Sequence, residues 1–360
     1  TKVRLSTALI REAAWDCFLI LFGESDTVAH HFWRFHDRQS PRHGGTGTDD
    51  LGDAIGRVYA ALDAAVGRLR ELLPEADVLI ASDHGFGGVG HKALHLNRWL
   101  AERGWLRFAR DGGGALATRL KRHALHWVPP AFQARLFRWR GASLANRLES
   151  QARFSGIDWA RTQVFSEELN YFPSFWLNVR GREALWTVAP EDYERVCREV
   201  CAAAAEWKDP EHGRPIVRRA WRLDELYAGP WIKFAPDIIL DLNEDSGYSY
   251  TCLPSRSQPG DATIRRLSPV ECGGGKLAGM SGSHRREGVF VLSGPNVRHD
   301  GWMEGIQMAD MTPTILSLCA VESHEDFDGE TVSSIVSDRQ SARSTGRQDA
   351  SVERDYGVRE

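Results

Sequence analysis

The chain has 360 residues, of which 42% are hydrophobic and 26% charged, a composition typical of a globular protein with one or two domains. Its net charge of −4 excludes a globally basic surface for nucleic acid or anionic membranes. The six cysteines lie far apart except for Cys197 and Cys201, which excludes a disulfide framework and a zinc–thiolate motif. No apolar run reaches the length of a membrane span.

The first chemical motif follows the first predicted strand. Residues 5–15 have a helical period, and the continuous apolar run 17–22 predicts a buried strand that ends at Gly23. Asp26 and His30 follow at a spacing of four, which places both side chains on one face if a helix starts here. A carboxylate and an imidazole so placed can hold one divalent ion. The alternative is that Asp26 caps the helix and His30 lies on the surface.

The next predicted strand ends in a second pair of candidate ligands. Residues 50–73 have one apolar helical face, and the apolar run 78–81 predicts a short buried strand. Asp83 and His84 follow this strand directly, ahead of a glycine-rich stretch that we interpret as a loop. The order helix, strand, site occurs twice, which favours a parallel sheet covered by helices. Open sheets of this class bind ligands at the carboxyl ends of their strands.

Two further segments are candidates for contacts with a ligand. His91, Lys92 and His95 precede or open a predicted helix at 94–103, and one of them is a candidate for reaching a substrate anion. The alternative is that they are solvated loop groups. Residues 112–150 are basic, aromatic and interrupted by two prolines, which indicates an inserted helical cap over the site or against an anionic ligand or membrane surface. The alternative is a helical pair that packs its aromatic residues on the core.

The last part of the chain adds a third candidate ligand segment. His284 follows a glycine-rich loop and precedes an apolar strand predicted at 289–292. A single histidine carries little information, but the three segments together offer two carboxylates and three imidazoles, each beside a predicted strand. Mixed nitrogen and oxygen ligands suit zinc, with manganese or iron as alternatives. From about Ser334 the chain is polar and predicted to be disordered.

Further elements are predicted between these segments and after them. They are a strand at 175–179, a helix at 190–207, a turn and strand at 235–242, and a helix that opens at 310–316.

In these motifs the sequence resembles the alkaline phosphatase superfamily, specifically its type I phosphodiesterase/nucleotide pyrophosphatase branch and the predicted phosphohydrolases/phosphomutases within it. The matching stretches run in family order and are 24–33, 82–85, 97–100, 178–183, 235–237, 282–285 and 310–314. The resemblance implies an α/β/α sandwich with a mostly parallel central sheet. This catalytic domain would comprise 1–111 and 151–333, with the helical cap inserted at 112–150 and a disordered tail at 334–360.

The resemblance also implies a two-metal phosphohydrolase. Asp26, His30 and His284 would hold one divalent ion, and Asp83 and His84 the other, with zinc favoured and manganese as the alternative. Two such ions about 4 Å apart clamp the attacking and leaving oxygens of an in-line displacement at phosphorus. In the family a Thr or Ser attacks phosphorus, and the phospho-enzyme is then hydrolysed.

One part of the family's site has no counterpart in this sequence. The family supplies its Thr or Ser nucleophile, and a further metal-binding Asp, from well upstream of the first motif, whereas only 25 residues precede Asp26. We therefore expect the nucleophile upstream of Thr1 and expect this chain alone to be inactive or impaired. The expected substrate is a small-molecule phosphate ester, a diester more than a monoester, with no nucleic-acid partner. Alternatives are a phosphomutase with the same phospho-enzyme and an inactive module that binds anionic ligands.

Overall fold

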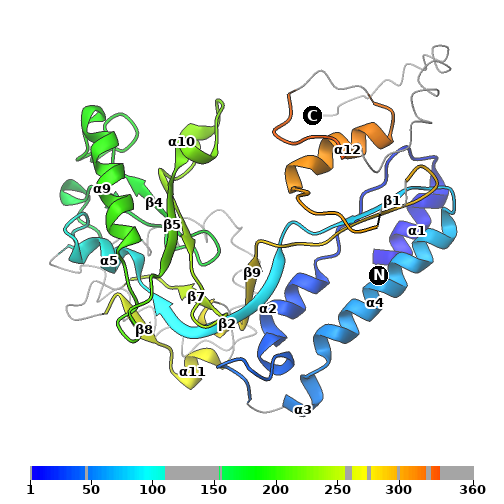
Figure 1. The fold of residues 1–360 in the computed structure, drawn as a ribbon, viewed down its shortest axis with the longest axis horizontal. Helices are drawn as coiled ribbons and strands as arrows, with labels where there is room; N and C mark the ends of the chain where they lie inside the picture. The colour runs from blue at the N-terminus through cyan, green and yellow to red at the C-terminus, as the bar shows by residue number, and fades with distance from the viewer. Residues whose placement is uncertain are drawn as a thin grey trace, which may run out of the picture. The chain divides into compact units, whose positions relative to one another are not determined.

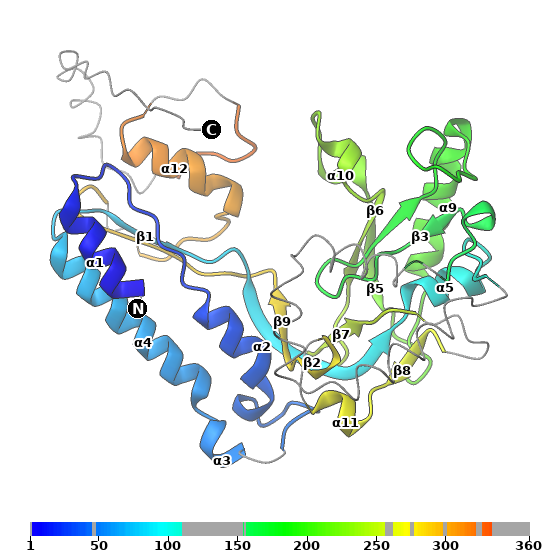
Figure 2. The ribbon, with the colours of Figure 1, turned by 180° about the vertical axis from the view of Figure 1, so that it is seen from behind.

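The computed structural model describes residues 2–44, 48–109, 154, 156–255, 262–273, 277–297, 301–321 and 326–332. The predicted cap at 112–150 and the predicted tail at 334–360 both lie outside these residues. The described helices include none that combines the length and the apolar character needed to cross a bilayer. Figures 1 and 2 show the fold from two opposite sides.

The chain folds as two compact units. The first comprises the residues up to Val28, residues 53–86 and the described residues from His284 onward, and the second comprises 29–52 and 87–283. Three elements run along the chain from one unit into the other; they are α2 (Glu24–His36), β2 (Gly85–Leu94) and β9 (Gly282–Arg285).

The first unit combines helices with one small sheet. Its elements are α1 (Lys2–Glu12), α4 (Ala54–Leu72), β1 (Val78–Ala81), β10 (Phe290–Ser293), η5 (Met308–Asp310) and α12 (Met311–Leu318). The apolar face predicted for α4 is present, and Ile55 and Ala65 on it are buried. Strands β1 and β10 pair antiparallel, with Ala81 opposite Phe290.

The predicted strand at 17–22 is wrong. Among the described residues this segment pairs with no strand, and the side chains of Leu19 and Leu21 are 79% and 84% exposed. An apolar run indicates that a segment can be buried, but a strand forms only where a neighbour supplies partners for its N–H and C=O groups. That neighbour is not encoded in the run itself.

The second unit carries two four-stranded sheets. Its helices are α3 (Thr48–Leu51), α5 (Leu96–Glu102), η1 (Trp159–Arg161), η2 (Pro190–Asp192), α9 (Tyr193–Ala205), α10 (Leu223–Leu226), η3 (Ile232–Phe234), α11 (Pro269–Cys272) and η4 (Leu277–Gly279). Its strands, besides β2 and β9, are β3 (Val164–Phe165), β4 (Ser174–Leu177), β5 (Val217–Arg222), β6 (Ile238–Leu242), β7 (Ser249–Cys252) and β8 (Ile264–Arg266).

The core of the second unit lies under α5 and α9. Helix α9 packs against β5 (Figure 1), and its Val196, Cys197 and Val200 side chains are fully or almost fully buried. Trp99 of α5 stacks on Phe175 of β4, with ring centroids 5.7 Å apart and planes 3° from parallel. Aromatic rings bury large areas and so dominate the energetics of such a core.

The structure is a mixed α/β fold with several sheets, and the mostly parallel central sheet is not confirmed. The strand order β3-β4-β6-β5 is antiparallel throughout, and β2 pairs parallel with β7 but antiparallel with β8. The prediction assumed that helix–strand alternation implies parallel crossovers. Alternation gives the order of elements along the chain, whereas strand direction depends on which strands meet.

The predicted glycine-rich loop after His84 is also wrong, because residues 85–94 form strand β2. Glycine serves here to admit close neighbours rather than to turn the chain. A Cβ at Gly88 would lie 2.7 Å from the ring of Tyr248 and 3.0 Å from the indole nitrogen of Trp33. The glycines therefore let aromatic side chains lie directly on the strand.

Candidate metal centre

Three of the predicted ligands come together within the first unit. One ligand atom from each of Asp26, His84 and His284 lies within 4.8 Å of the other two. Asp26 Oδ1 is 3.6 Å from His284 Nε2 and 3.9 Å from His84 Nε2. The two imidazole rings are stacked, with centroids 3.6 Å apart and planes 17° from parallel. Both Nε2 atoms thus lie near the same carboxylate oxygen.

Each ligand is placed by a different element. Asp26 lies in the first turn of α2, which starts at Glu24, so Asp26 is not the helix cap that the alternative interpretation required. His84 follows the end of β1, and His284 lies on β9. The three side chains are 23–46% exposed. A ligand from solvent can therefore reach them.

Neither separation is that of a hydrogen bond, and the shorter one matches the spacing of two ligand atoms around one ion. Distances of 3.6 and 3.9 Å are too long for N–H···O bonds. Ligand atoms about 2.0–2.2 Å from a tetrahedral ion lie roughly 3.3–3.6 Å from one another. The donor set of two imidazoles and one carboxylate is one that zinc accepts.

The tautomer of His84 is fixed by a backbone contact. Its Nδ1 lies 3.0 Å from the carbonyl oxygen of Gly85, and because a carbonyl only accepts, Nδ1 carries the proton. The lone pair is then on Nε2, the atom that lies in the cluster. Metal-bound histidines commonly have this second contact, which orients the ring.

Asp83 lies at the edge of this cluster. Its Oδ1 is 3.6 Å from His84 Nε2, and its side chain is 78% exposed. The structure thus brings Asp83 beside His84, as the sequence motif implied, but does not test whether the pair holds an ion of its own. The assignment of these side chains to one or two ions stays a prediction.

His30, the remaining predicted ligand, belongs to the second unit. It follows Asp26 by one turn of α2 and is 5% exposed, so it is not the surface residue of the alternative interpretation. Its Nδ1 lies 2.9 Å from the carbonyl oxygen of Gly282. As in His84, this contact places the proton on Nδ1 and the lone pair on Nε2.

Tyr171 is a neighbour of His30 that the sequence did not identify. Its hydroxyl lies 3.4 Å from His30 Nδ1, and the two rings are 5.1 Å apart between centroids. Glu168, three residues before Tyr171, is buried with a positive φ of 53° and accepts hydrogen bonds from the Asn97 backbone and the Ser255 hydroxyl. Burial raises the pKa of Glu168 against the opposing effect of its hydrogen bonds. No motif surrounds Tyr171, so only the fold reveals this contact.

Lys92 and His91 lie on β2, where neither is placed as a solvated loop group. The Lys92 side chain is 4% exposed, and its ammonium lies 2.7 Å from Asp209, 3.0 Å from Glu211 and 3.1 Å from Asp245. Burial, with a smaller effect of neighbouring Arg266, lowers the pKa of His91, so its ring is neutral near pH 7. Lys92 therefore has a structural role, and neither side chain offers a free positive charge to a substrate.

Several other motif residues are buried structural groups of the second unit. Asp237 accepts two hydrogen bonds from Arg182, one from the backbone N–H of Leu177 and one from the Tyr193 hydroxyl. Asn178 donates to three backbone carbonyls. These residues satisfy buried polar groups, so their part of the motif set maintains the fold.

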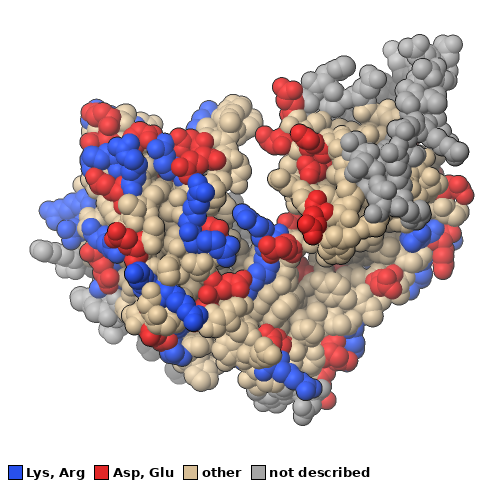
Figure 3. All heavy atoms as spheres, in the orientation of Figure 1, with Lys and Arg blue, Asp and Glu red and all other residues tan. Residues whose placement is uncertain are grey.

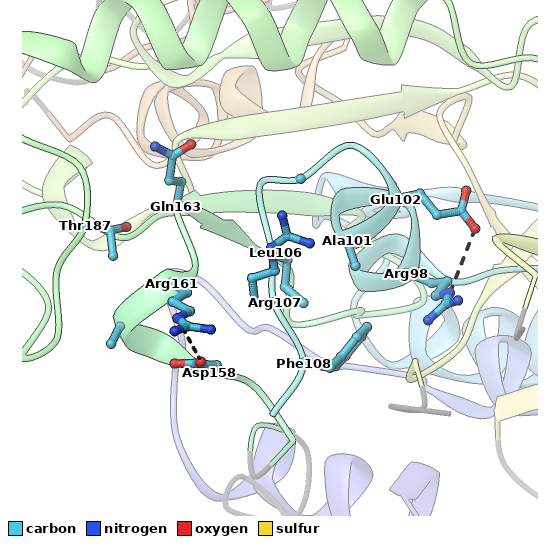
Figure 4. Close-up of a pocket in the computed structure, with 12 residues that line it drawn as sticks. Arg98, Ala101, Glu102, Leu106, Arg107, Phe108, Asp158, Arg161, Gln163 and Thr187 are labelled. Carbon is cyan, nitrogen blue, oxygen red and sulfur yellow. Dashed lines mark ion pairs between the residues drawn. The ribbon is translucent and has the colours of Figure 1, made fainter. Parts of the chain in front are cut away.

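A cavity of about 1180 Å³ in the second unit contains none of the predicted ligands (Figure 4). Arg98, Arg107 and Arg161 contribute to its lining, together with Glu102 and Asp158. Arg98 lies 3.8 Å from Glu102, and Arg161 lies 3.9 Å from Asp158. This cavity is therefore distinct from the cluster of Asp26, His84 and His284.

Gly85→Ala is expected to damage the cluster through the backbone. A Cβ at Gly85 would lie 1.9 Å from the carbonyl oxygen of Glu287, so the chain next to His84 must shift. We expect a loss of about 1–3 kcal/mol in the free energy of unfolding, measured by urea denaturation, and weaker zinc binding. The control is Gly67→Ala on α4, where a Cβ meets nothing within 4 Å; it is expected to stabilise by about 0.5–1 kcal/mol. Equal effects of the two changes would contradict this account.

The comparisons with known proteins give one match. A family model described as type I phosphodiesterase / nucleotide pyrophosphatase matches residues 2–258. The matched range includes Asp26, His30, Asp83 and His84, whereas His284 lies beyond it and joins the cluster through the fold. No curated protein and no solved structure matches the chain.

Proposed function

The chain belongs to the type I phosphodiesterase / nucleotide pyrophosphatase family, and on this basis we propose that it acts in metal-dependent hydrolysis of a phosphodiester. The observation that carries the proposal is the convergence of Asp26, His84 and His284, whose ligand atoms lie within 4.8 Å of one another. The family implies cleavage of phosphoric ester bonds. The proposal adds that these three residues hold the divalent ion, with zinc preferred and manganese as the alternative.

The ligand charges favour an anionic substrate. Two neutral imidazoles and one carboxylate leave a divalent ion with one net positive charge, which attracts the single negative charge of a phosphodiester. When bound, the ion supplies Lewis-acid activation and charge neutralisation. The protein itself keeps the lone pair of His84 on Nε2, because Nδ1 contacts the Gly85 carbonyl, and it leaves the ligands accessible.

Asp83 and His30 are the further ligand candidates in this proposal. Asp83 is largely exposed and lies beside His84, so a second carboxylate is available at the same end of β1. His30 has its Nδ1 proton directed at a backbone carbonyl, the arrangement that suits a metal-binding Nε2. A second ion held by Asp83 and His84, as the resemblance implied, would make the two-metal displacement possible.

The test is hydrolysis of bis(4-nitrophenyl) phosphate and 4-nitrophenyl phosphate by the full-length product of the gene. Dialysis against a chelator is expected to abolish activity, and zinc or manganese to restore it, with the diester cleaved faster than the monoester. Calorimetry on the 360-residue chain measures metal binding independently of turnover. Hydrolysis that survives complete metal removal, or an absence of zinc and manganese binding, would overturn the proposal.

A further inference from the structure

An exposed aromatic segment extends from one end of the β5–β6 pair in the second unit. Strands β5 and β6 pair antiparallel, with Arg222 opposite Ile238, and the chain between them forms α10 and η3. We call Leu226–Phe234 the aromatic tip. Figures 1 and 2 show α10 and the adjoining chain extending beyond the ends of β5 and β6.

Four large apolar side chains of the aromatic tip are exposed. The exposed fractions are 76% for Trp231, 66% for Phe234, 56% for Tyr227 and 37% for Leu226. The Trp231 and Phe234 rings are stacked on each other with centroids 6.0 Å apart. Exposed apolar residues scattered singly need no explanation, but a contiguous group of aromatic residues marks a contact surface.

The base of this segment is firmly held. Leu223 is buried, and its N–H donates to the carbonyl oxygen of Asp237 at 3.0 Å. Within the tip the backbone bonds are local, from Ile232 to Gly229 and from Phe234 to Trp231. Ile232 and Lys233 line a small pocket together with Leu223 and Asp237, so these two tip residues adjoin the rest of the unit. The exposed aromatic rings are therefore presented on a supported loop.

Charge is arranged so that the tip itself carries no carboxylate. Of the three acidic residues between β5 and β6, Asp224 and Glu225 lie in α10, where Asp224 pairs with Arg222 at 2.6 Å, and Asp237 is buried next to β6. The single charged residue of the tip is Lys233, whose ammonium lies 5.1 Å from the centre of the Phe234 ring. In Figure 3 the surface at the place of α10 is mostly tan, in agreement with this sequence.

This chemistry matches the interface of a phospholipid bilayer. Tryptophan and tyrosine favour the headgroup level, where the ring is in an apolar layer and its polar atom in water. A lysine beside them can reach lipid phosphates while its methylene stem stays in the apolar layer. We propose that the aromatic tip anchors the protein peripherally to a phospholipid surface.

A second copy of the chain fits the tip less well. Three aromatic side chains of roughly 150–250 Å² each, exposed by about two thirds, offer roughly 400 Å². A stable interface buries about 800 Å² per partner, so the tip supplies about half of what a dimer needs. Insertion into lipid has no such requirement for a complementary surface.

The test is flotation of the protein with vesicles of phosphatidylcholine. We expect the double variant Trp231→Ser/Phe234→Ser to lower the vesicle-bound to free ratio at least tenfold. The matched control is Trp302→Ser, which removes a tryptophan that is 88% exposed in the first unit and is expected to change the ratio less than twofold. Because the tip has one charge, adding phosphatidylserine or 0.5 M salt is expected to change binding less than threefold.

Other outcomes would overturn the proposal. These are a wild-type protein that does not float with vesicles, a Trp302→Ser variant that loses binding equally, and a wild-type dimer by sedimentation velocity that the double variant abolishes. Circular dichroism melting of the double variant is expected to match the wild type, because the tip makes mainly local contacts. The proposal does not depend on the metal centre, and zinc binding by the double variant should be unchanged.

Discussion

His284→Ala is expected to lower zinc affinity by at least about 100-fold, more than the roughly 10–100-fold cost of losing a residue that only orients a ligand. Nε2 of His284 lies 3.6 Å from Asp26 Oδ1 in the cluster, so its loss leaves one imidazole and one carboxylate. Calorimetry measures the affinity, and hydrolysis of bis(4-nitrophenyl) phosphate by the full-length product is expected to fall in parallel. His31→Ala, which removes an exposed histidine of α2, is the matched control and is expected to change neither.

Calorimetry on His84→Ala, His284→Ala and the double variant decides whether these ligands share one ion. If His84 and His284 hold one ion together, each single variant and the double variant lose the same ion, and the bound metal falls by one equivalent in all three. If they belong to different ions, as the resemblance implied, the double variant loses two equivalents. His30→Ala then shows whether His30 shares the ion with Asp26. Zinc affinity that is unchanged in both His84→Ala and His284→Ala would contradict the proposed metal centre.

Lys92→Met is expected to lower the free energy of unfolding by about 3–5 kcal/mol, the usual cost of removing one partner from a buried charge network. The Lys92 ammonium is 4% exposed and contacts three carboxylates, of which Asp209 is fully buried. Without the ammonium, Asp209 keeps a desolvated charge close to Asp245. The measurement is urea denaturation, with the exposed Lys208→Met as the control. A loss below about 0.5 kcal/mol, which is typical of surface substitutions, would contradict the structural role of Lys92.

The effect of Lys92→Met is expected to depend on pH with a defined sign. Burial by itself raises the pKa of Asp209, but its bond to Lys92 prevails and the pKa is lowered. The stabilisation that comes from the lowered pKa of Asp209 is present above the ordinary carboxyl pKa of about 4. It is lost as the pH falls through the lower pKa of the folded state. The pKa of Lys92 is raised by the same bonds against burial, so its contribution is present below about pH 10. The difference in the free energy of unfolding between wild type and variant should therefore shrink as the pH falls below about 4.

A divalent cation is expected to restore part of the stability of Lys92→Met. Ligand atoms of Asp209, His212 and Asp245 lie within 4.8 Å of one another, and the lysine ammonium contacts the two carboxylates of this group. Removing the ammonium leaves a ligand set for manganese or zinc, and binding to the folded state raises stability by mass action. Manganese should therefore raise the Tm of the variant more than that of the wild type.

The sequence identified the types of chemical groups and most of the helices. Asp26 and His30 were expected on one helix because a spacing of four is a local property, and α2 carries both. The apolar run before Asp83 forms strand β1, but the prediction that this strand is buried is wrong, because its residues are half-buried or exposed and Ile80 is 40% exposed. Local period and residue type require no knowledge of distant partners, which is why the helix and the strand themselves are predicted correctly.

Only the tertiary structure decided which groups meet. It joined Asp26 to His84 and His284, turned the glycine-rich segment into strand β2, and placed Lys92 among carboxylates more than 100 positions later in the chain. It also left the apolar run 17–22 without a strand partner among the described residues. Strand pairing and the burial of charge depend on contacts between segments far apart in sequence, and neither periodicity nor motif spacing specifies those contacts.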